Sequence, residues 1–413
     1  MTRITLRLDS LLHELDSLAS FSDAPAPAVT RIVFSPMDLK GRAYLEGLCS
    51  AAGLEIRKDA VGNTFARWVG DDPALPAIGT GSHTDAVPHS GRYDGTVGVL
   101  GGLEAIRSLQ RSGFRPRRSV ELLIFTSEEP TRFGIGCLGS RLLSGALTAD
   151  HARGLQDKEG RSLEDVRHAA RFMGSLDDVP LASGYYHAFV ELHIEQGPLL
   201  ERKNIPIGIV NAIAAPAGLR VSIEGSGGHA GAVLMPDRHD AFLAAAEIAL
   251  AVESAAKATR AADSVATVGV CDVFPGAVNS IPSRTVLQID VRDTDLVRRD
   301  GVLVTICKAC EEIVGARGVK VQIDLVNADA PARSSPLVIG ALEQSCHDLD
   351  FESMSMVSRA YHDSLFMSRI APVGMIFIPC REGVSHRPDE YAAPRDIERG
   401  VQVLAHTLAH LAA

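Results

Sequence analysis

Hydrophobic and polar positions change their spacing along the chain, and each spacing predicts a type of element. Ile4–Leu18, Met37–Ala52 and Gly95–Gln110 have the apolar periodicity of helices. Ser119–Thr126 is a short apolar run, typical of a strand buried on both faces of a parallel sheet. Further strands are predicted at Glu55–Asp59, Ala77–Ser82 and Phe189–His193. This alternation predicts an α/β domain with a mixed, mostly parallel sheet.

The pattern changes between about Pro216 and Pro331. The elements predicted there are, in order, a strand at Leu219–Glu224, a helix at Arg238–Ala256, strands at Ala266–Val273 and Thr285–Arg292, a helix at Leu303–Gly315 and a strand at Val319–Val326. The order β-α-β-β-α-β is the ferredoxin-like arrangement. The sequence therefore predicts an α+β domain, residues 216–330, inserted into a catalytic domain formed by residues 1–215 and 331–413. The catalytic domain is expected to end with a helix at Arg399–Leu411.

Composition narrows the class of protein. The 413 residues are 46% hydrophobic and 22% charged, which is usual for a globular chain of two or more domains. A net charge of -10 without a basic run disfavours a nucleic-acid partner. The chain contains no bilayer-spanning apolar run, and charged residues are spread through its first ten residues, which lack the apolar core of a secretory signal. Together with seven scattered cysteines, these features predict a cytoplasmic protein with no membrane partner.

Two short motifs are not interpreted as functional sites. Cys307 and Cys310 form a Cys-x-x-Cys inside a predicted helix, but no second cysteine pair completes a zinc site. Gly134–Gly139 matches the spacing of a dinucleotide fingerprint, but it does not directly follow a strand. Buried helix cysteines and an ordinary glycine-rich loop are the simpler interpretations.

Five segments place histidines or carboxylates at strand ends or in glycine-rich loops. They are Gly81–Val87 with Tyr93–Gly95, Ser127–Pro130, Glu191–Gly197, Gly227–Gly231 and Ser385–Glu390. In α/β sheets ligands collect at the carboxyl ends of the strands, where imidazoles and carboxylates from several strands converge.

The candidate metal ligands within these segments are His83, Asp94, Glu129, His193 and His386. Three imidazoles and two carboxylates suit two divalent ions that share one bridging carboxylate, and such a pair activates water and polarises a carbonyl. Asp85, two residues after His83, is expected to hold the far ring nitrogen of that histidine.

At these residues the sequence resembles the amidohydrolase branch of the aminoacylase/carboxypeptidase metallohydrolase superfamily. The branch includes allantoate amidohydrolases, N-carbamoyl-L-amino-acid hydrolases, β-alanine synthases and ureidoglycolate amidohydrolases. The resemblance extends from about Val29 to the C-terminal helix and is strongest at Glu191–Gly197 and Gly374–His386. It implies two divalent ions per subunit, with Mn²⁺ favoured and Zn²⁺ as the alternative, and an inserted domain that acts as a lid and joins two subunits into a homodimer.

The resemblance also implies a role for each candidate residue. His83 and His193 would bind one metal ion, Glu129 and His386 the other, and Asp94 would bridge them. Glu128 would be the general base, and His229 of the inserted domain would polarise the attacked carbonyl, from its own subunit or from the partner. The remaining substrate contacts would come from Asn279 and Arg292 on the carboxylate and Gln196 on the ureido group.

Within the branch, four stretches are most similar to ureidoglycolate amidohydrolases: Ser127–Phe133, Gly228–Pro236, Asn279–Ser283 and Ser358–Phe366. In the last stretch, Arg359 and Tyr361 occupy positions beside His362 where the allantoate and carbamoyl enzymes have glycines. A phenol there would narrow the pocket and offer a hydroxyl partner, so Tyr361 and His362 are predicted to contact the substrate.

The predicted reaction is hydrolysis of (S)-ureidoglycolate, a small ureido carboxylic acid, to glyoxylate, carbon dioxide and ammonia in purine catabolism. Allantoate or N-carbamoyl-L-amino acids are the alternative substrates. A metallopeptidase of the same superfamily is disfavoured by Arg292, which suits a small acid, and a non-catalytic binding protein by the presence of Glu128 with the full ligand set.

Overall fold

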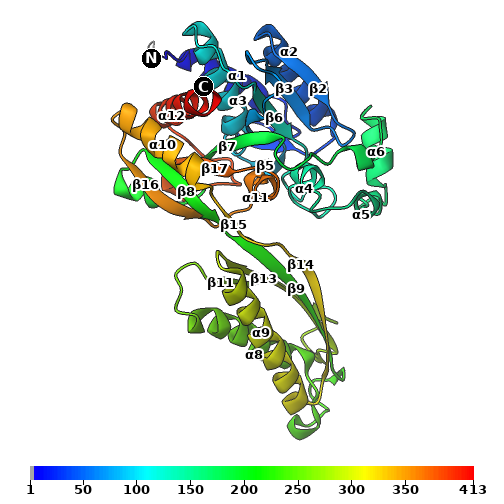
Figure 1. Ribbon diagram of the computed structural model, residues 1–413. Coiled ribbons are helices and arrows are strands. Elements are labelled where there is room, and N and C mark those ends of the chain that lie inside the picture. The colour runs from blue at the N-terminus through cyan, green and yellow to red at the C-terminus, as the bar shows by residue number, and fades with distance from the viewer. Residues whose placement is uncertain (1–3) are drawn as a thin grey trace. The chain divides into compact units, whose positions relative to one another are not determined.

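The computed structural model describes residues 4–413 (Figure 1), so the first three residues of the charged N-terminal stretch lie outside the described part. The chain divides into two compact units. One contains the chain up to Asn211 together with Arg333–Ala413, and the other is Ala212–Ala332. In the described part of the chain, no helix has the length and apolar character needed to cross a bilayer.

A mixed sheet forms the centre of the first unit. Its strands are β2 Glu55–Lys58, β3 Thr64–Trp68, β4 Ala77–His83, β6 Val120–Phe125, β7 Tyr186–Ile194, β8 Ile207–Ile213, β15 Ala332–Arg333, β16 Ser353–Ser358 and β17 Val373–Ile378. They lie in the order β15-β8-β17-β7-β4-β6-β3-β2, and β16 pairs with β8. Strands β17, β7, β4 and β6 pair in parallel, whereas β8, β3 and β2 pair antiparallel. The predicted α/β fold with a mixed sheet is confirmed, and its parallel pairing is confined to the centre.

Helices pack on both faces of this sheet. The helices of the first unit are α1 Leu8–Ala19, α2 Pro36–Ala51, α3 Thr96–Arg111, α4 Leu138–Leu143, α5 Ala149–Arg153, α6 Leu163–Ala169, α7 Leu199–Lys203, α10 Pro336–Asp348, α11 Asp363–Met367 and α12 Pro394–Ala412. Strand β6 alternates between two cores: Leu122 and Ile124 pack with α3 and α12, and Leu123 and Phe125 pack with α4. Short strands β1 Val29–Arg31 and β5 Ala86–Ser90 pair separately, and η1 Leu176–Asp178 and η3 Arg381–Gly383 are single 3-10 turns.

The second unit is an antiparallel sheet with two helices on one face (Figure 1). Its strands are β9 Ala215–Glu224, β11 Val265–Phe274, β13 Arg284–Asp293 and β14 Lys320–Ala328, in the order β11-β13-β9-β14. Helices α8 Ala241–Ala258 and α9 Leu296–Arg317 pack over it, and η2 Met235–Asp237 precedes α8. Asp240 caps α8, and Gly318 in the left-handed region ends α9. Element order and strand order are those of the ferredoxin-like arrangement.

Candidate metal centre and active site

The candidate metal ligands of the first unit come from the carboxyl ends of neighbouring parallel strands. His83 is the last residue of β4, His193 is the penultimate residue of β7, and Glu129 follows β6. Asp94 precedes α3, and His386 lies in the loop after β17. Parallel strands bring their carboxyl ends to one edge, so residues far apart in the sequence meet there.

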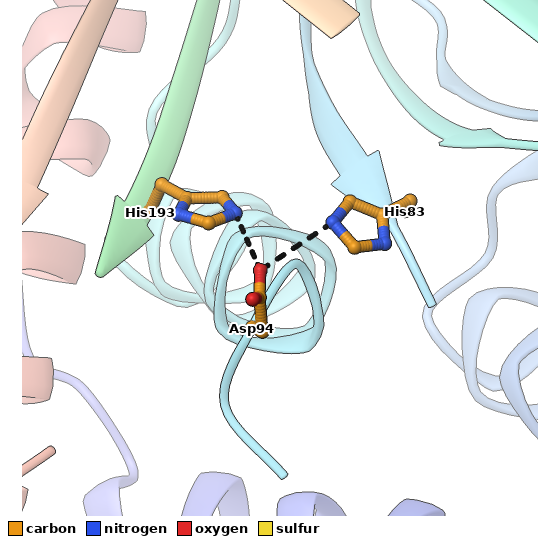
Figure 2. A group of neighbouring side chains, drawn as sticks. All are labelled: His83, Asp94 and His193. Carbon is orange, nitrogen blue, oxygen red and sulfur yellow. Dashed lines mark ion pairs between the residues drawn. The ribbon is translucent and has the colours of Figure 1, made fainter. Parts of the chain in front are cut away.

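Asp94 lies between two groups of ligands. Its Oδ1 is 3.1 Å from His193 Nε2 and 3.6 Å from His83 Nε2, as Figure 2 shows. Its Oδ2 is 3.1 Å from His386 Nε2, which in turn lies 3.2 Å from Glu129 Oε1. The structure thus brings the five residues together as two possible metal-binding groups that share one carboxylate.

The electrostatics of this cluster favour bound positive charge. Burial lowers the pKa of His83, but the charge of Glu128 and the hydrogen bond to Asp94 raise it well above its ordinary value. Hydrogen bonds to Asp94 and Glu129 raise the pKa of His386 to about 11. Buried carboxylates with mixed nitrogen and oxygen donors are a ligand set that divalent cations fit. Gly95 is required beside it, because a Cβ there would lie 2.5 Å from the His83 ring.

Glu128 lies next to the first ligand group. Its Oε2 is 3.7 Å from His83 Nε2, and its Oε1 accepts a hydrogen bond from the Cys137 thiol at 3.4 Å. Burial raises the pKa of Glu128 well above its ordinary value, and the opposing charge of His83 does not reverse the shift. A carboxylate with a raised pKa beside a metal cluster has the chemistry of a general base.

Asp85 contacts both the His83 ring and the ligand segment after β6. The Nδ1 atom of His83 lies 3.1 Å from the backbone carbonyl oxygen of Asp85 and 3.7 Å from its carboxylate. The carboxylate instead accepts hydrogen bonds from the backbone N–H groups of Glu128, at 3.1 Å, and Glu129, at 3.0 Å. The main chain and the carboxylate of Asp85 therefore both lie beside the far nitrogen of the His83 ring, and the carboxylate also fixes the segment after β6.

Two residues that the sequence analysis left without a role support Asp94. Glu390 Oε1 accepts hydrogen bonds from the backbone N–H groups of Tyr93, at 2.8 Å, and Asp94, at 3.1 Å. The Ser385 hydroxyl lies 2.8 Å from Asp94 Oδ2 and 3.0 Å from Glu390 Oε2. Both residues belong to the segment that contains His386. Their closeness in sequence to this predicted ligand is the feature that could have identified them as supporting residues.

Gln196 also contacts Asp94. Its Nε2 donates to Asp94 Oδ2 at 2.8 Å, while its Oε1 is buried without a hydrogen-bond partner. A buried acceptor that lacks a donor is costly unless a ligand supplies one. This amide therefore has a free acceptor for an N–H group of a substrate.

His362 and Tyr361 lie at the start of α11. The His362 ring packs edge-on against His193 at 4.6 Å, and burial keeps its pKa well below the ordinary value, so it is neutral. Tyr361 stacks on Phe366, and its hydroxyl accepts a hydrogen bond from Arg141 at 3.4 Å. The phenol is therefore oriented by packing and by a guanidinium.

Glu191 forms a third possible ligand group with His193 and His362. Its Oε1 accepts from Ser82 Oγ at 2.8 Å, and its Oε2 accepts from the hydroxyl and backbone N–H of Ser364. Both oxygens are satisfied by protein donors, so Glu191 joins the loop that contains Tyr361 to the ligand strands.

In the second unit, His229 and Asn279 lie side by side. Strand β10, Gly228–His229, pairs with β12, Ser280–Ile281, and the Ala230 N–H donates to the Asn279 carbonyl oxygen at 2.8 Å. His229 is exposed, and its Nδ1 accepts from the Gly231 N–H at 3.1 Å. A neutral imidazole that accepts a hydrogen bond at Nδ1 carries its proton on Nε2. The Nε2–H group of His229 is then a donor that the contact with Gly231 does not use.

Arg292 lies at the opposite end of β13. The β10–β12 pair lies near Arg284, since the Gly225 N–H donates to the neighbouring Ser283 carbonyl oxygen. Eight residue steps of strand separate Arg284 from Arg292, which corresponds to about 26 Å. Arg292 Nε forms an ion pair with Asp290 at 2.7 Å. Within one copy of the second unit, strand β13 therefore keeps Asn279 and Arg292 apart.

Comparison with known proteins identifies the family. The model of a family described as peptidase family M20/M25/M40 matches residues 79–410. The chain belongs to this family. The matched range contains every candidate metal ligand and Glu128, so in this M20/M25/M40 protein the cluster around Asp94 lies inside the region that the family shares.

Similar proteins of known name cover nearly the whole length of this M20/M25/M40 chain. A protein of Oryza sativa subsp. japonica named "Ureidoglycolate hydrolase" is 53% identical over 98% of this chain and 84% of its own length. A crystal structure of AtUAH in complex with glyoxylate has a TM-score of 0.90 and 51% identity, covering 99% of this chain and 98% of the other. A crystal structure of AtUAH with (S)-hydroxyglycine matches with the same TM-score and coverage at 50% identity.

Proposed function

We propose that the protein is an amidohydrolase that hydrolyses the ureido C–N bond of (S)-ureidoglycolate. One molecule of ureidoglycolate with one of water gives hydroxyglycine, carbon dioxide and ammonia, and hydroxyglycine then loses a second ammonia to give glyoxylate. The two molecules bound in the AtUAH crystals, (S)-hydroxyglycine and glyoxylate, are the organic products of these two steps. The observation that carries the proposal is the shared carboxylate of Asp94 in a chain 53% identical to a ureidoglycolate hydrolase.

We assign two divalent ions to the cluster around Asp94. His83 and His193 would hold one ion, Glu129 and His386 the other, and each would take one oxygen of Asp94. When bound, such a pair supplies Lewis-acid polarisation of the attacked carbonyl and lowers the pKa of water. The mixed nitrogen and oxygen donors suit Mn²⁺ and Zn²⁺ alike, and we favour Mn²⁺ because of the resemblance described for the sequence.

Glu128 is the proposed general base and acid. It would take a proton from the attacking water and deliver it to the leaving nitrogen, and its raised pKa suits both halves of that transfer. Gln196 would accept from the ureido NH₂ through its unpartnered Oε1. Tyr361, held by Arg141 and Phe366, and His362 would contact the substrate at its central carbon.

The second unit would complete the site as a lid, and we propose that it does so in a homodimer. A ureido acid spans about two residues of extended chain, about 7 Å, whereas the ends of β13 are about 26 Å apart. One substrate therefore reaches Arg292 from one subunit and His229 with Asn279 from the other. The His229 Nε2–H would stabilise the developing oxyanion, and Asn279 and Arg292 would hold the carboxylate.

The cytoplasm is the proposed location, because all seven cysteines of the chain are free thiols. The exposed thiol of Cys271 and the half-buried thiol of Cys307 suit a reducing compartment.

A substrate panel tests the proposal. Mn²⁺-loaded protein is assayed for ammonia release from (S)-ureidoglycolate, allantoate and N-carbamoyl-L-amino acids, with Glu128→Gln as the matched inactive control. We expect the highest kcat/KM on ureidoglycolate. A higher kcat/KM on allantoate or on a carbamoyl amino acid would reassign the substrate, and release of amino acids from dipeptides would favour a peptidase.

A further inference from the structure

A second group of metal-type ligands lies in the first unit on α10 and α12. A ring nitrogen of His406, a ring nitrogen of His410 and a carboxylate oxygen of Asp348 all lie within 4.8 Å of one another. The two histidines are four residues apart on α12, so they project from the same face of the helix, and Asp348 is the last residue of α10. None of the three belongs to the cluster around Asp94.

The distances match those between ligands of one ion. Two donors about 2.1 Å from a tetrahedral Zn²⁺ lie about 3.4 Å from each other. His410 Nε2 is 3.2 Å from Asp348 Oδ2, and the third donor is within 4.8 Å of both.

The nitrogens of this group lack other partners. His406 Nδ1 is buried without a hydrogen-bond partner, and the partner of the buried His410 Nε2 is the Asp348 carboxylate of the same group. An imidazole nitrogen that is withdrawn from water normally finds a partner.

The helices that present the three ligands are held firmly together. Thr407 Oγ1, next to His406 on α12, donates to Ser345 Oγ on α10 at 2.9 Å, and both side chains are buried. This contact fixes the spacing of the two helices close to the ligand group. The group therefore does not depend on a loop for its geometry.

From these observations we infer that Asp348, His406 and His410 form a binding site for one transition-metal dication, separate from the centre at Asp94. Two imidazoles and one carboxylate are a ligand set that Zn²⁺ binds, with a fourth position left for water. Bound there, the ion would join the C-terminal end of α10 to α12 and stabilise the folded chain.

Zinc counting tests the site. Full-length protein and the double variant His406→Ala/His410→Ala are saturated with Zn²⁺, desalted and measured for zinc per chain by mass spectrometry. We expect one equivalent more in the parent than in the variant, with both keeping the same kcat when loaded with Mn²⁺. His347→Ala is the matched control, since it removes a histidine next to Asp348 that is outside the ligand group.

A second measurement tests the site if the double variant does not fold. Asp348→Asn preserves the size of the side chain and removes the charged donor, so it should lose the same zinc equivalent. Adding Zn²⁺ to Mn²⁺-loaded protein should raise the thermal midpoint of the parent and of His347→Ala by a few degrees, and leave that of Asp348→Asn unchanged. Equal zinc counts and equal thermal shifts in all these proteins would overturn the inference and leave an ordinary ion pair.

Discussion

Asp85→Asn tests how the ligand segment after β6 is held. In the folded protein the two oxygens of Asp85 accept from the consecutive N–H groups of Glu128 and Glu129 at 3.1 and 3.0 Å. Asparagine has the same size, but it has only one oxygen, and its NH₂ group would face an N–H. One hydrogen bond is lost and two donors are brought together at a buried position.

The size of the effect follows from these contacts. A hydrogen bond to a charged group is worth about 1.5–3 kcal/mol, and each 1.36 kcal/mol in the barrier changes a rate tenfold. If the whole loss is expressed in the transition state, kcat falls by about 10- to 150-fold. Residues that orient metal ligands typically cost 10–100-fold in affinity or activity, which agrees with this range. Because substrate contacts are untouched, KM should change little.

The assay is steady-state ammonia release with Mn²⁺-loaded protein, together with the metal content of each sample. Asp157→Asn is the control, since Asp157 is also a buried carboxylate that accepts from two backbone amides, those of Glu159 and Arg161. The control should lose thermal stability and keep kcat. If Asp85→Asn keeps both the parental kcat and the parental metal content, the Asp85 carboxylate does not position the segment.

Four further predictions follow from the site. Glu128→Gln should bind substrate normally and lose about 10²–10⁴-fold in kcat; near-parental turnover would make Glu128 structural. Chelation should abolish ammonia release and Mn²⁺ should restore it, whereas full activity of metal-free protein would refute the dinuclear assignment. Arg292→Lys should raise KM for ureidoglycolate, because an ammonium cannot make a planar two-point contact with a carboxylate; an unchanged KM would place the carboxylate elsewhere. Tyr361→Phe should lower kcat/KM on ureidoglycolate by about 5- to 10-fold through one lost hydrogen bond, and the parental value would leave Tyr361 as a packing residue against Arg141.

Much of the fold was predictable because the central strands are apolar on both faces. Ser119–Thr126 was predicted as a strand and β6 is Val120–Phe125; Phe189–His193 was predicted and β7 is Tyr186–Ile194. Each of the two strands ends at or a few residues before a candidate site residue: Glu128 follows β6, and His193 lies at the end of β7. Because the carboxyl ends of parallel strands meet at one edge, the sequence pattern alone indicated which side chains would lie together.

Other features were not predictable because they depend on contacts between distant segments. Glu390 accepts from the backbone of Asp94 across 296 residues of sequence, and no periodicity records such a contact. The hydrogen bonds from the backbone amides of Glu128 and Glu129 to the Asp85 carboxylate also join segments that are more than 40 residues apart, and sequence neighbours do not determine such contacts. The separation of Asn279 from Arg292 follows from strand β13 between them, which only the register of the sheet reveals.

The supporting residues share one property that bears on metal binding. Asp85, Glu191 and Glu390 are buried acids whose partners include backbone N–H groups and, for the last two, serine hydroxyls. A lysine or arginine could not replace these acids, because a cationic side chain cannot accept a hydrogen bond from an N–H or hydroxyl group, and it would also bring a full positive charge next to the ligands. Neutral donors satisfy the supporting carboxylates without cancelling the negative charge around Asp94. The same contacts that fix the geometry therefore leave the charge that divalent ions would balance, which is why acids rather than bases support this site.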